Sequence, residues 1–123
     1  MYLIHKGDDA MADKTLLSGS TTLLVLKLLE GGEMYGYQMI EELRRRSDRT
    51  FELKAGTLYP LLHSLEQQGW VTAREQSGGD AARPRRYYAL TEAGRGQLAQ
   101  KEAEWRTYAA AVTQVLEGGA CLA

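Results

Sequence analysis

The sequence is poor in the residues that build disulfides, metal sites and catalytic centres. Its 123 residues include one cysteine and two histidines. The single cysteine, Cys121, excludes an intrachain disulfide, and without a Cys-x-x-Cys pair there is no zinc knuckle. The only histidines are His5 and His63, and no Gly-x-Ser-x-Gly elbow or phosphate-binding glycine-rich loop is present. We therefore predict that the chain uses no metal and no cofactor and is not an enzyme.

Long apolar runs are also missing. No run approaches the roughly 20 apolar residues that a membrane-spanning helix needs, and the start of the chain lacks the architecture of a signal peptide. We therefore expect no membrane partner and a cytoplasmic location. The formal net charge of -1 excludes a uniformly basic surface, so any affinity for nucleic acid must come from local clusters of cations. A content of 44% hydrophobic and 25% charged residues is typical of one globular domain.

Residues 54–70 predict a short helix with two different faces. One face has the i, i+3, i+4, i+7 spacing of a buried side and consists of Leu58, Leu61, Leu62 and Leu65. The opposite face is expected to be exposed and carries Tyr59, His63, Glu66 and Gln67. The alternative is a packing helix whose polar side is merely wet. The basic β-hairpin predicted after this helix favours an exposed face that reads a partner.

Pro60 and Gly69 mark the ends of this helix. Proline is tolerated in a first turn, where the backbone donors are unpaired, so the helix should begin near Gly56 or Thr57. Gly69 accepts the left-handed conformation that ends a helix. This places Thr57 and Tyr59 at the N-terminal end, where free amides and the helix dipole favour a phosphate.

The β-hairpin comes directly after this helix in the sequence. Residues 71–76 and 85–90 have the pattern of two strands, and residues 77–83 are rich in turn formers. Three cations lie within four residues, opposed locally only by Asp80: Arg83, Arg85 and Arg86. A loop has little reason to be so basic for folding, so the hairpin and the exposed helix face together indicate contact with phosphates and grooves. Of Tyr87 and Tyr88, one should face the core and the other solvent, depending on register.

Two helices are expected before this segment. The first starts near Ser18 or Ser20 and stops at Gly31-Gly32; it is apolar nearly all round and should be the central core helix. The second, in residues 33–46, places four residues on one face: Gly36, Met39, Ile40 and Leu43. Gly36 should let another backbone approach closely, and the arginines that end the helix should pair with its glutamates. Residues 50–53 alternate like a short strand, with Phe51 and Leu53 pointing inward.

A long helix is predicted at the end of the chain. Thr91 should cap it, and a helix from Glu92 to Glu117 would be about 39 Å long, more than the diameter of a small domain. Its apolar positions repeat as in a coiled-coil seam that is interrupted at Lys101: Leu98, Trp105, Tyr108, Val112, Val115 and Leu116. We expect this seam to pack on the same helix of a second subunit; the alternative is that the helix folds back over its own domain.

Five motifs occur in order between about Leu16 and Leu116. They are Tyr35-Gly-Tyr37, Gly56-Thr-Leu-Tyr-Pro60, Leu65-Glu66 with Gly69, Arg83-Pro-Arg-Arg-Tyr-Tyr88 and Leu90-Thr-Glu-Ala-Gly94. In these motifs the chain resembles the PadR-like family of bacterial transcriptional regulators, in the subgroup with a single short C-terminal helix. The resemblance implies a mainly α structure with a small β-hairpin (α+β), in which a winged helix-turn-helix domain is followed by a dimerisation helix. It also implies a homodimeric repressor that binds an inverted-repeat operator in double-stranded DNA, and several members of the family respond to phenolic or drug-like effectors.

The resemblance and the residue pattern together predict the parts of the chain and its sites. We expect a tail at 1–14, within which Met11 is a second candidate initiator, a winged helix-turn-helix domain at 15–90, a dimerisation helix at 91–118 and a tail at 119–123. The candidate DNA contacts are Tyr35, Lys54, Gly56, Thr57, Tyr59, His63, Arg83, Arg85 and Arg86. The seam residues form the candidate dimer interface, and Trp105 is also the candidate site for a small aromatic effector. The alternatives are a winged-helix module that binds another protein without binding DNA, and an unrecognised small enzyme; a basic hairpin beside exposed Tyr59 and His63 favours DNA.

Overall fold

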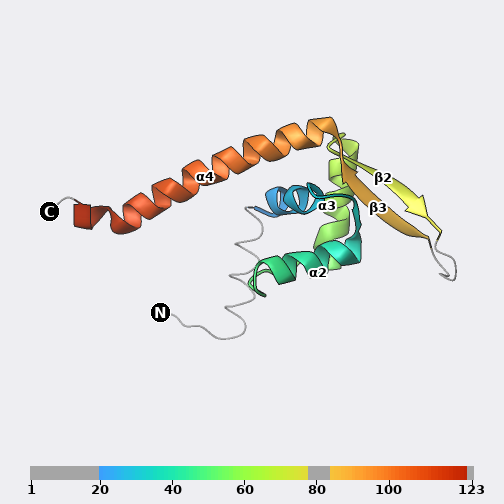
Figure 1. The fold of residues 1–123 in the computed structure, drawn as a ribbon, viewed down its shortest axis with the longest axis horizontal. Helices are drawn as coiled ribbons and strands as arrows, with labels where there is room; N and C mark the ends of the chain where they lie inside the picture. Colours follow the sequence, from blue (N-terminus) through green and yellow to red (C-terminus); the bar gives the residue numbers. More distant parts are fainter. Residues whose placement is uncertain (1–19, 78–83, 122–123) are drawn as a thin grey trace.

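The computed structural model of the chain describes residues 20–77 and 84–121. Within these residues lie four helices and a three-stranded antiparallel sheet (Figure 1). The expected tail at 1–14, the candidate cap Ser18, Asp80 and the candidate DNA contact Arg83 lie outside the described residues. No helix in the described ranges is both long enough and apolar enough to cross a membrane.

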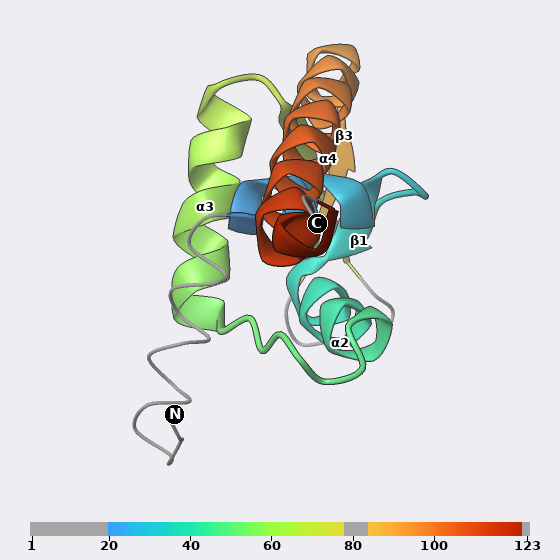
Figure 2. The same cartoon turned by 90° about the vertical axis from the view of Figure 1, so that its left-hand side faces the viewer.

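The first helix, residues 20–29, is the centre of the core, as its composition predicts. Val25, Leu26, Leu28 and Leu29 are almost completely buried. Figures 1 and 2 show this helix, drawn in blue, enclosed between α4 (Glu92–Cys121) on one side and α2 (Gly36–Arg46) on the other. A helix that is apolar on most of its surface needs such cover on several sides.

The second helix is shorter than predicted because its first residues form a strand. Met34–Tyr35 is β1, which pairs antiparallel with β3 (Arg85–Leu90) through Met34 opposite Tyr88 and Tyr35 opposite Tyr87. The helix α2 then starts at Gly36 and buries Gly36, Met39 and Leu43 as predicted, whereas Ile40 is only partly buried. Two residues are too few to show strand periodicity in the sequence, and the pairing partner lies more than 50 residues away.

The strand predicted at residues 50–53 is wrong. Asp48 and Arg49 have positive φ angles of 52° and 66°, so the chain makes a left-handed turn and residues 51–54 have no regular structure. Both edges of β3 are already occupied by β1 and by β2 (Val71–Gln76), which leaves no place for another strand beside it. Leu53 nevertheless enters the core and Phe51 packs against it.

The helix α3 (Ala55–Gln67) begins earlier than predicted and ends where predicted. Lys54 is its N-cap, so Pro60 lies in the second turn instead of the first. There the missing amide of the proline removes one hydrogen bond of the helix. At the other end Gly69 has φ 82°, and the amides of Gly69 and Trp70 donate to the carbonyls of Glu66 and Leu65 in a Schellman motif.

The hairpin and the last helix complete the fold. β2 and β3 pair from Val71 opposite Leu90 to Gln76 opposite Arg85, and this register buries Tyr88 and leaves Tyr87 half-buried. The helix α4 is capped by Thr91, whose hydroxyl accepts a hydrogen bond from the Gly94 amide, and it continues to Cys121, beyond the expected end at Glu117. It runs straight away from the body, and the hairpin extends from the opposite end of the molecule (Figure 1).

Candidate nucleic-acid interface

The helix α3 has the two faces that the sequence predicts. Leu58, Leu62 and Leu65 are buried at 0 to 1% exposure, and Leu61 packs partly against them. On the other side Tyr59 is 46% exposed and His63 is exposed as well. The helix therefore presents an aromatic ring and an imidazole, one turn apart, outside the core.

Tyr59 also has a structural contact that the sequence did not reveal. An added Cβ at Gly36 would lie less than 3.0 Å from the Oη, Cζ and Cε1 atoms of the Tyr59 ring. Gly36 was expected to admit another backbone, but it admits this tyrosine ring instead. The exposed edge of Tyr59 is thus held at a defined position against the first residue of α2.

The start of α3 exposes Lys54, Gly56 and Thr57. Because α3 starts at Ala55, Tyr59 lies in the second turn and not at the N-terminal end as predicted. The carbonyl of Lys54 accepts hydrogen bonds from the amides of Thr57 and Leu58, both at 2.9 Å. The amide of Thr57 is therefore already bonded, which corrects the expectation that it is free. Within the described residues no side chain caps the helix, so the amides that remain for an anion at this end are those of Ala55 and Gly56.

Arg86 is paired, contrary to the prediction that only Asp80 opposes the cations of the hairpin. Its Nη2 atom donates to both carboxylate oxygens of Glu66 on α3, at 3.1 and 3.0 Å, and its Nη1 atom lies 3.7 Å from the Glu75 carboxylate. The hydrogen bond to Glu66 is the main cause that raises the pKa of Arg86. Arg86 thus links the hairpin to α3, the helix whose exposed face is predicted to contact DNA.

Arg85 is differently placed. Its guanidinium carbon lies 4.6 Å from the centroid of the Tyr35 ring, and within the described part of the chain no carboxylate pairs with it. The Tyr35 ring in turn meets the Tyr87 ring edge-on, with 5.4 Å between the centroids. Arg85 therefore lies on an aromatic surface with its charge still available to a phosphate.

Arg74 lies beside the same pair of tyrosine rings, and the sequence analysis singled out neither Arg74 nor its partner Glu33. Arg74 lies opposite Tyr87 in the register, 5.0 Å from the centroid of its ring, and forms a bidentate ion pair with Glu33. This pair lowers the pKa of the Glu33 carboxyl and raises that of Arg74. The alternation of β2 places Arg74 on the outer face, but its partner follows only from the pairing of three strands.

Three of the predicted DNA contacts are thus brought together around the start of α2. Arg85 packs on Tyr35, and the neighbouring Gly36 packs on Tyr59. His63 follows Tyr59 by one turn, and Lys54, Gly56 and Thr57 lie at the N-terminal end of the same helix. We call the exposed residues of α3 and β3 in this group, together with the half-buried Tyr35 of β1, the α3–hairpin surface.

The predicted seam on α4 is exposed from Trp105 onwards. Trp105 is 48% exposed, Val115 81% and Leu116 78%, and Tyr108 and Val112 are exposed too. Leu98 must be removed from the seam, because it is 3% exposed and belongs to the core of its own chain. Lys101, where the seam is interrupted, lies 5.7 Å from the ring centroid of Trp70. The outer half of α4 therefore carries an apolar stripe that the rest of the described chain leaves uncovered.

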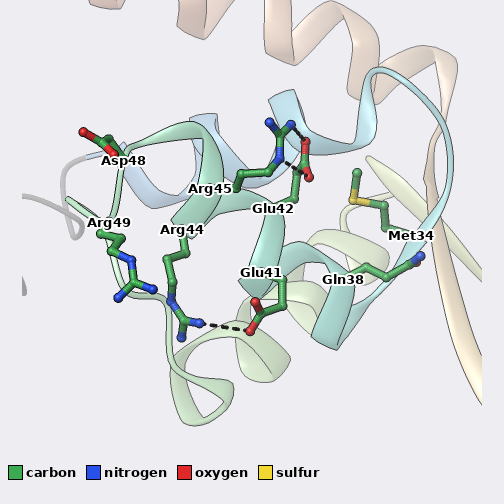
Figure 3. A pocket seen from close by; sticks show the side chains of 8 residues that line it. All are labelled: Met34, Gln38, Glu41, Glu42, Arg44, Arg45, Asp48 and Arg49. Carbon is green, nitrogen blue, oxygen red and sulfur yellow. Dashed lines mark hydrogen bonds and ion pairs between the residues drawn. The ribbon is translucent and has the colours of Figure 1, made fainter.

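A shallow depression of about 590 Å³ lies on the outer side of α2 (Figure 3). It is lined by Met34, Gln38, Glu41, Glu42, Arg44, Arg45, Asp48 and Arg49. Arg44 pairs with Glu41 at 3.1 Å and Arg45 with Glu42 at 2.6 Å, within the helix. As predicted, the arginine run pairs with the glutamates of its own helix, and three cations face three anions. Such a balanced surface offers little to a charged ligand.

The described residues contain no group of three or more histidine, cysteine, aspartate or glutamate side chains that could hold a metal ion. The structure brings aromatic rings and cations together instead. These are side chains that contact bases and phosphates.

Comparison with known proteins points to one family. The model of the transcriptional regulator PadR-like family matches residues 25–100. The structure of a PadR family transcriptional regulator from Eggerthella lenta is 33% identical, with a TM-score of 0.73 over 89% of this chain and 95% of that one. A PadR family regulator from Clostridium difficile is 30% identical, with a TM-score of 0.69 over 79% of this chain and 98% of that one. A transcriptional regulator of Mycobacterium tuberculosis is 37% identical over 78 residues, which are 63% of this chain and 68% of that protein. The predicted fold class, mainly α with a small β-hairpin in a winged helix-turn-helix domain, is confirmed, and β1 adds a third strand to the hairpin.

Proposed function

Because the chain belongs to the PadR-like family of transcriptional regulators, we propose that it is a homodimeric repressor that binds an inverted-repeat operator and is released by a small aromatic effector. Membership of this family makes the chain a DNA-binding regulator and not an enzyme, as the sequence predicted. A regulator of bacterial genes works in the cytoplasm, which is where we place it.

The observation that carries the proposal is the exposed face of α3 beside an unpaired cation of the hairpin. Tyr59 and His63 stand outside the core where base edges would lie, and Arg85 offers a charge without a carboxylate partner in the described chain. In helix-turn-helix proteins the second helix of the motif enters the major groove while other elements contact the backbone. We assign Tyr59 and His63 to base contacts and Arg85, Lys54 and the start of α3 to phosphate contacts.

The dimer and the effector are proposed from α4. A helix of 30 residues is about 45 Å long, and its outer half exposes an apolar stripe that water disfavours. Pairing of this stripe with that of a second subunit would cover it. Within the stripe the rings of Trp105 and Tyr108 lie 5.8 Å apart and are inclined by 36°, which leaves aromatic surface for a flat compound to stack on.

Binding measurements on single variants test the DNA proposal. Arg85→Ala should weaken binding to all DNA and make the dependence of log K on log salt shallower by about 1.8, since each subunit of the dimer loses one phosphate contact. His63→Ala should weaken binding to the operator by about 1 to 3 kcal/mol per half-site and binding to random DNA much less. The probe is a duplex that the wild-type protein selects from random-sequence DNA. Arg106→Ala on α4, which removes one cation away from the α3–hairpin surface, is the control.

These variants also separate the DNA proposal from its alternative. A chain that selects no sequence from the random pool would be a winged-helix module for a protein partner. If the Arg85→Ala protein binds DNA with the affinity and salt dependence of the wild type, Arg85 of the hairpin does not contact DNA.

Arg86 should behave differently from Arg85 because Glu66 already holds it. Arg86→Gln and Glu66→Gln both break the same link, so the double variant should bind the operator about as well as either single variant. An exposed ion pair contributes at most about 1 kcal/mol to stability. The salt dependence of DNA binding should be the same in these variants as in the wild type. A shallower salt dependence in Arg86→Gln would show that Arg86 leaves Glu66 and contacts a phosphate.

Fluorescence tests the effector. The chain has two tryptophans, Trp70 and Trp105, so the emission of Trp105 is isolated in a Trp70→Phe variant. Flat aromatic compounds should quench this emission and should lower operator affinity over the same concentration range. Quenching without loss of operator affinity would show that a compound bound at Trp105 does not release the protein from DNA, which would contradict the effector proposal.

A further inference from the structure

The end of α3 is fastened directly to the start of α4, although 22 residues separate Gly69 from Thr91. The Thr91 hydroxyl donates a hydrogen bond to the Gly69 carbonyl at 2.6 Å and accepts one from the Gly94 amide at 3.0 Å. The Thr91 amide donates to the Trp70 carbonyl at 3.1 Å. One side chain therefore satisfies a carbonyl just beyond α3 and an amide in the first turn of α4.

Gly94 brings the two backbones into contact. An added Cβ there would overlap the Trp70 carbonyl oxygen and would lie 3.0 Å from its carbonyl carbon. Only a residue without a side chain lets α4 start this close to the end of α3. Figures 1 and 2 both show the end of α3 beside the first turn of α4.

The contacts continue for more than two turns along α4. Leu98 is buried in the common core, and the Lys101 ammonium lies 5.7 Å from the centroid of the Trp70 ring. One turn beyond Leu98, Glu102 pairs with Lys27 of the first helix at 3.4 Å. The Schellman motif at Gly69 also defines the direction in which the chain leaves α3. The end of α3 and the first turns of α4 are therefore joined by direct contacts at this junction.

From this geometry we infer that Thr91 and Gly94 determine which half-site spacing the dimer accepts. The inference rests on the proposed pairing of subunits through α4. If the two α4 helices pair, the angle between α3 and α4 in each subunit sets the separation of the two recognition helices. Half-sites of helix-turn-helix dimers lie one helical turn of DNA apart or a multiple of it. A rigid junction selects one such spacing, whereas a loosened junction accepts several.

Distances between subunits test the junction without DNA. A spin label on Gln67→Cys, an exposed position near the end of α3, is measured against its copy in the partner, in a Cys121→Ser background that removes the native thiol. The parent protein should give a narrow distance distribution. Thr91→Val keeps the shape of the side chain but loses its hydroxyl, and it should broaden the distribution. Thr91→Ser keeps the hydroxyl and should restore the narrow one.

Gly94→Ala is the second variant, because its methyl group must push the Trp70 carbonyl away. Gly94→Ala should shift the mean distance between the two spin labels. Thermal unfolding followed by circular dichroism identifies the temperatures at which each variant is folded. A Thr91→Val distribution as narrow as that of the parent, in folded protein, would overturn the inference. Absence of dipolar coupling in the parent itself would instead overturn the proposed dimer, and the inference with it.

Binding shows whether the junction acts on specificity. The probes are the selected inverted repeat and two copies in which one base pair is added or removed between the half-sites. Thr91→Val should lose most of the preference for the selected spacing, and Thr91→Ser should keep it. Equal weakening on all three duplexes would mean that Thr91 contributes only to stability, which would overturn the assignment to specificity.

Discussion

At Gly36 the lack of a side chain decides the position of a residue on another helix. The ring of Tyr59 occupies the space that a Cβ at Gly36 would need. Glycine is disfavoured within a helix by up to about 1 kcal/mol relative to alanine, so its presence at the start of α2 is compensated by this contact. The sequence shows a glycine between two tyrosines, but only the packing of α3 on α2 shows what the glycine admits.

Gly36→Ala should therefore destabilise the protein and weaken operator binding, because the Tyr59 ring must leave its place. In a Tyr59→Ala background the same substitution should be neutral or stabilising, since the space is then empty and alanine favours the helix. Urea unfolding of the two single variants and the double variant measures this coupling. Gly96→Ala on α4, where an added Cβ meets nothing within 4 Å, should stabilise in both backgrounds. Equal effects of Gly36→Ala in both backgrounds would contradict the contact.

At the scale of the element, the arginines near the end of α2 form ion pairs with glutamates of the same helix. Glu42 accepts hydrogen bonds from Arg45 at 2.6 Å and from Arg46 at 2.8 Å. These hydrogen bonds lower the pKa of Glu42 to about 2, and the bond from Arg45 has the larger effect. The arginines Arg45 and Arg46 thus stabilise their own helix, and the cations that we propose for DNA, Arg85 and Lys54, lie outside α2.

The pKa of Glu42 predicts how this link depends on pH. A carboxyl whose pKa is lower in the folded than in the unfolded chain contributes stability above its ordinary value of 4.5, and the contribution is lost as the pH falls toward about 2. Carboxyl NMR titration should place the Glu42 pKa near 2 in the wild type and closer to 4.5 in Arg45→Gln. A wild-type Glu42 that titrates near its ordinary value would show that the pair does not persist in solution.

At the scale of the whole molecule, the direction of α4 is the feature on which the proposed dimer rests. The first turns of α4 cover the first helix, and its outer half extends past the domain (Figure 1). Its inner part enters the core through Leu98, and its outer half leaves five large apolar side chains exposed: Trp105, Tyr108, Val112, Val115 and Leu116. No other part of the described chain covers this stripe, which is the observation that supports the proposed dimer.

Val112→Asp/Leu116→Asp should abolish the dimer, because the interface would then bury charges without partners. Operator binding should weaken strongly, since one recognition helix makes half of the contacts. The inner core lies elsewhere, so the variant should stay folded as a monomer in sedimentation and circular dichroism. Ala110→Asp/Gln114→Asp adds the same charge to the opposite face of α4 and is the matched control. If this control dissociates and the Val112/Leu116 variant does not, the subunits pair through the other face.

The sequence by itself determined the parts of this protein that depend on neighbouring residues. Leucine spacing defined α3, Gly69 its end, Thr91 the cap of α4, and the apolar run at residues 20–29 the centre of the core, because periodicity and capping act within a few residues of each other. Tertiary structure decided the rest, because it depends on contacts between distant residues. The pairing of Met34–Tyr35 with β3, the capture of Arg86 by Glu66, the Tyr59 ring on Gly36 and the burial of Leu98 each join positions at least 20 residues apart or on different elements. Such contacts follow from how elements pack, and a pattern along one element contains no information about the element that will face it.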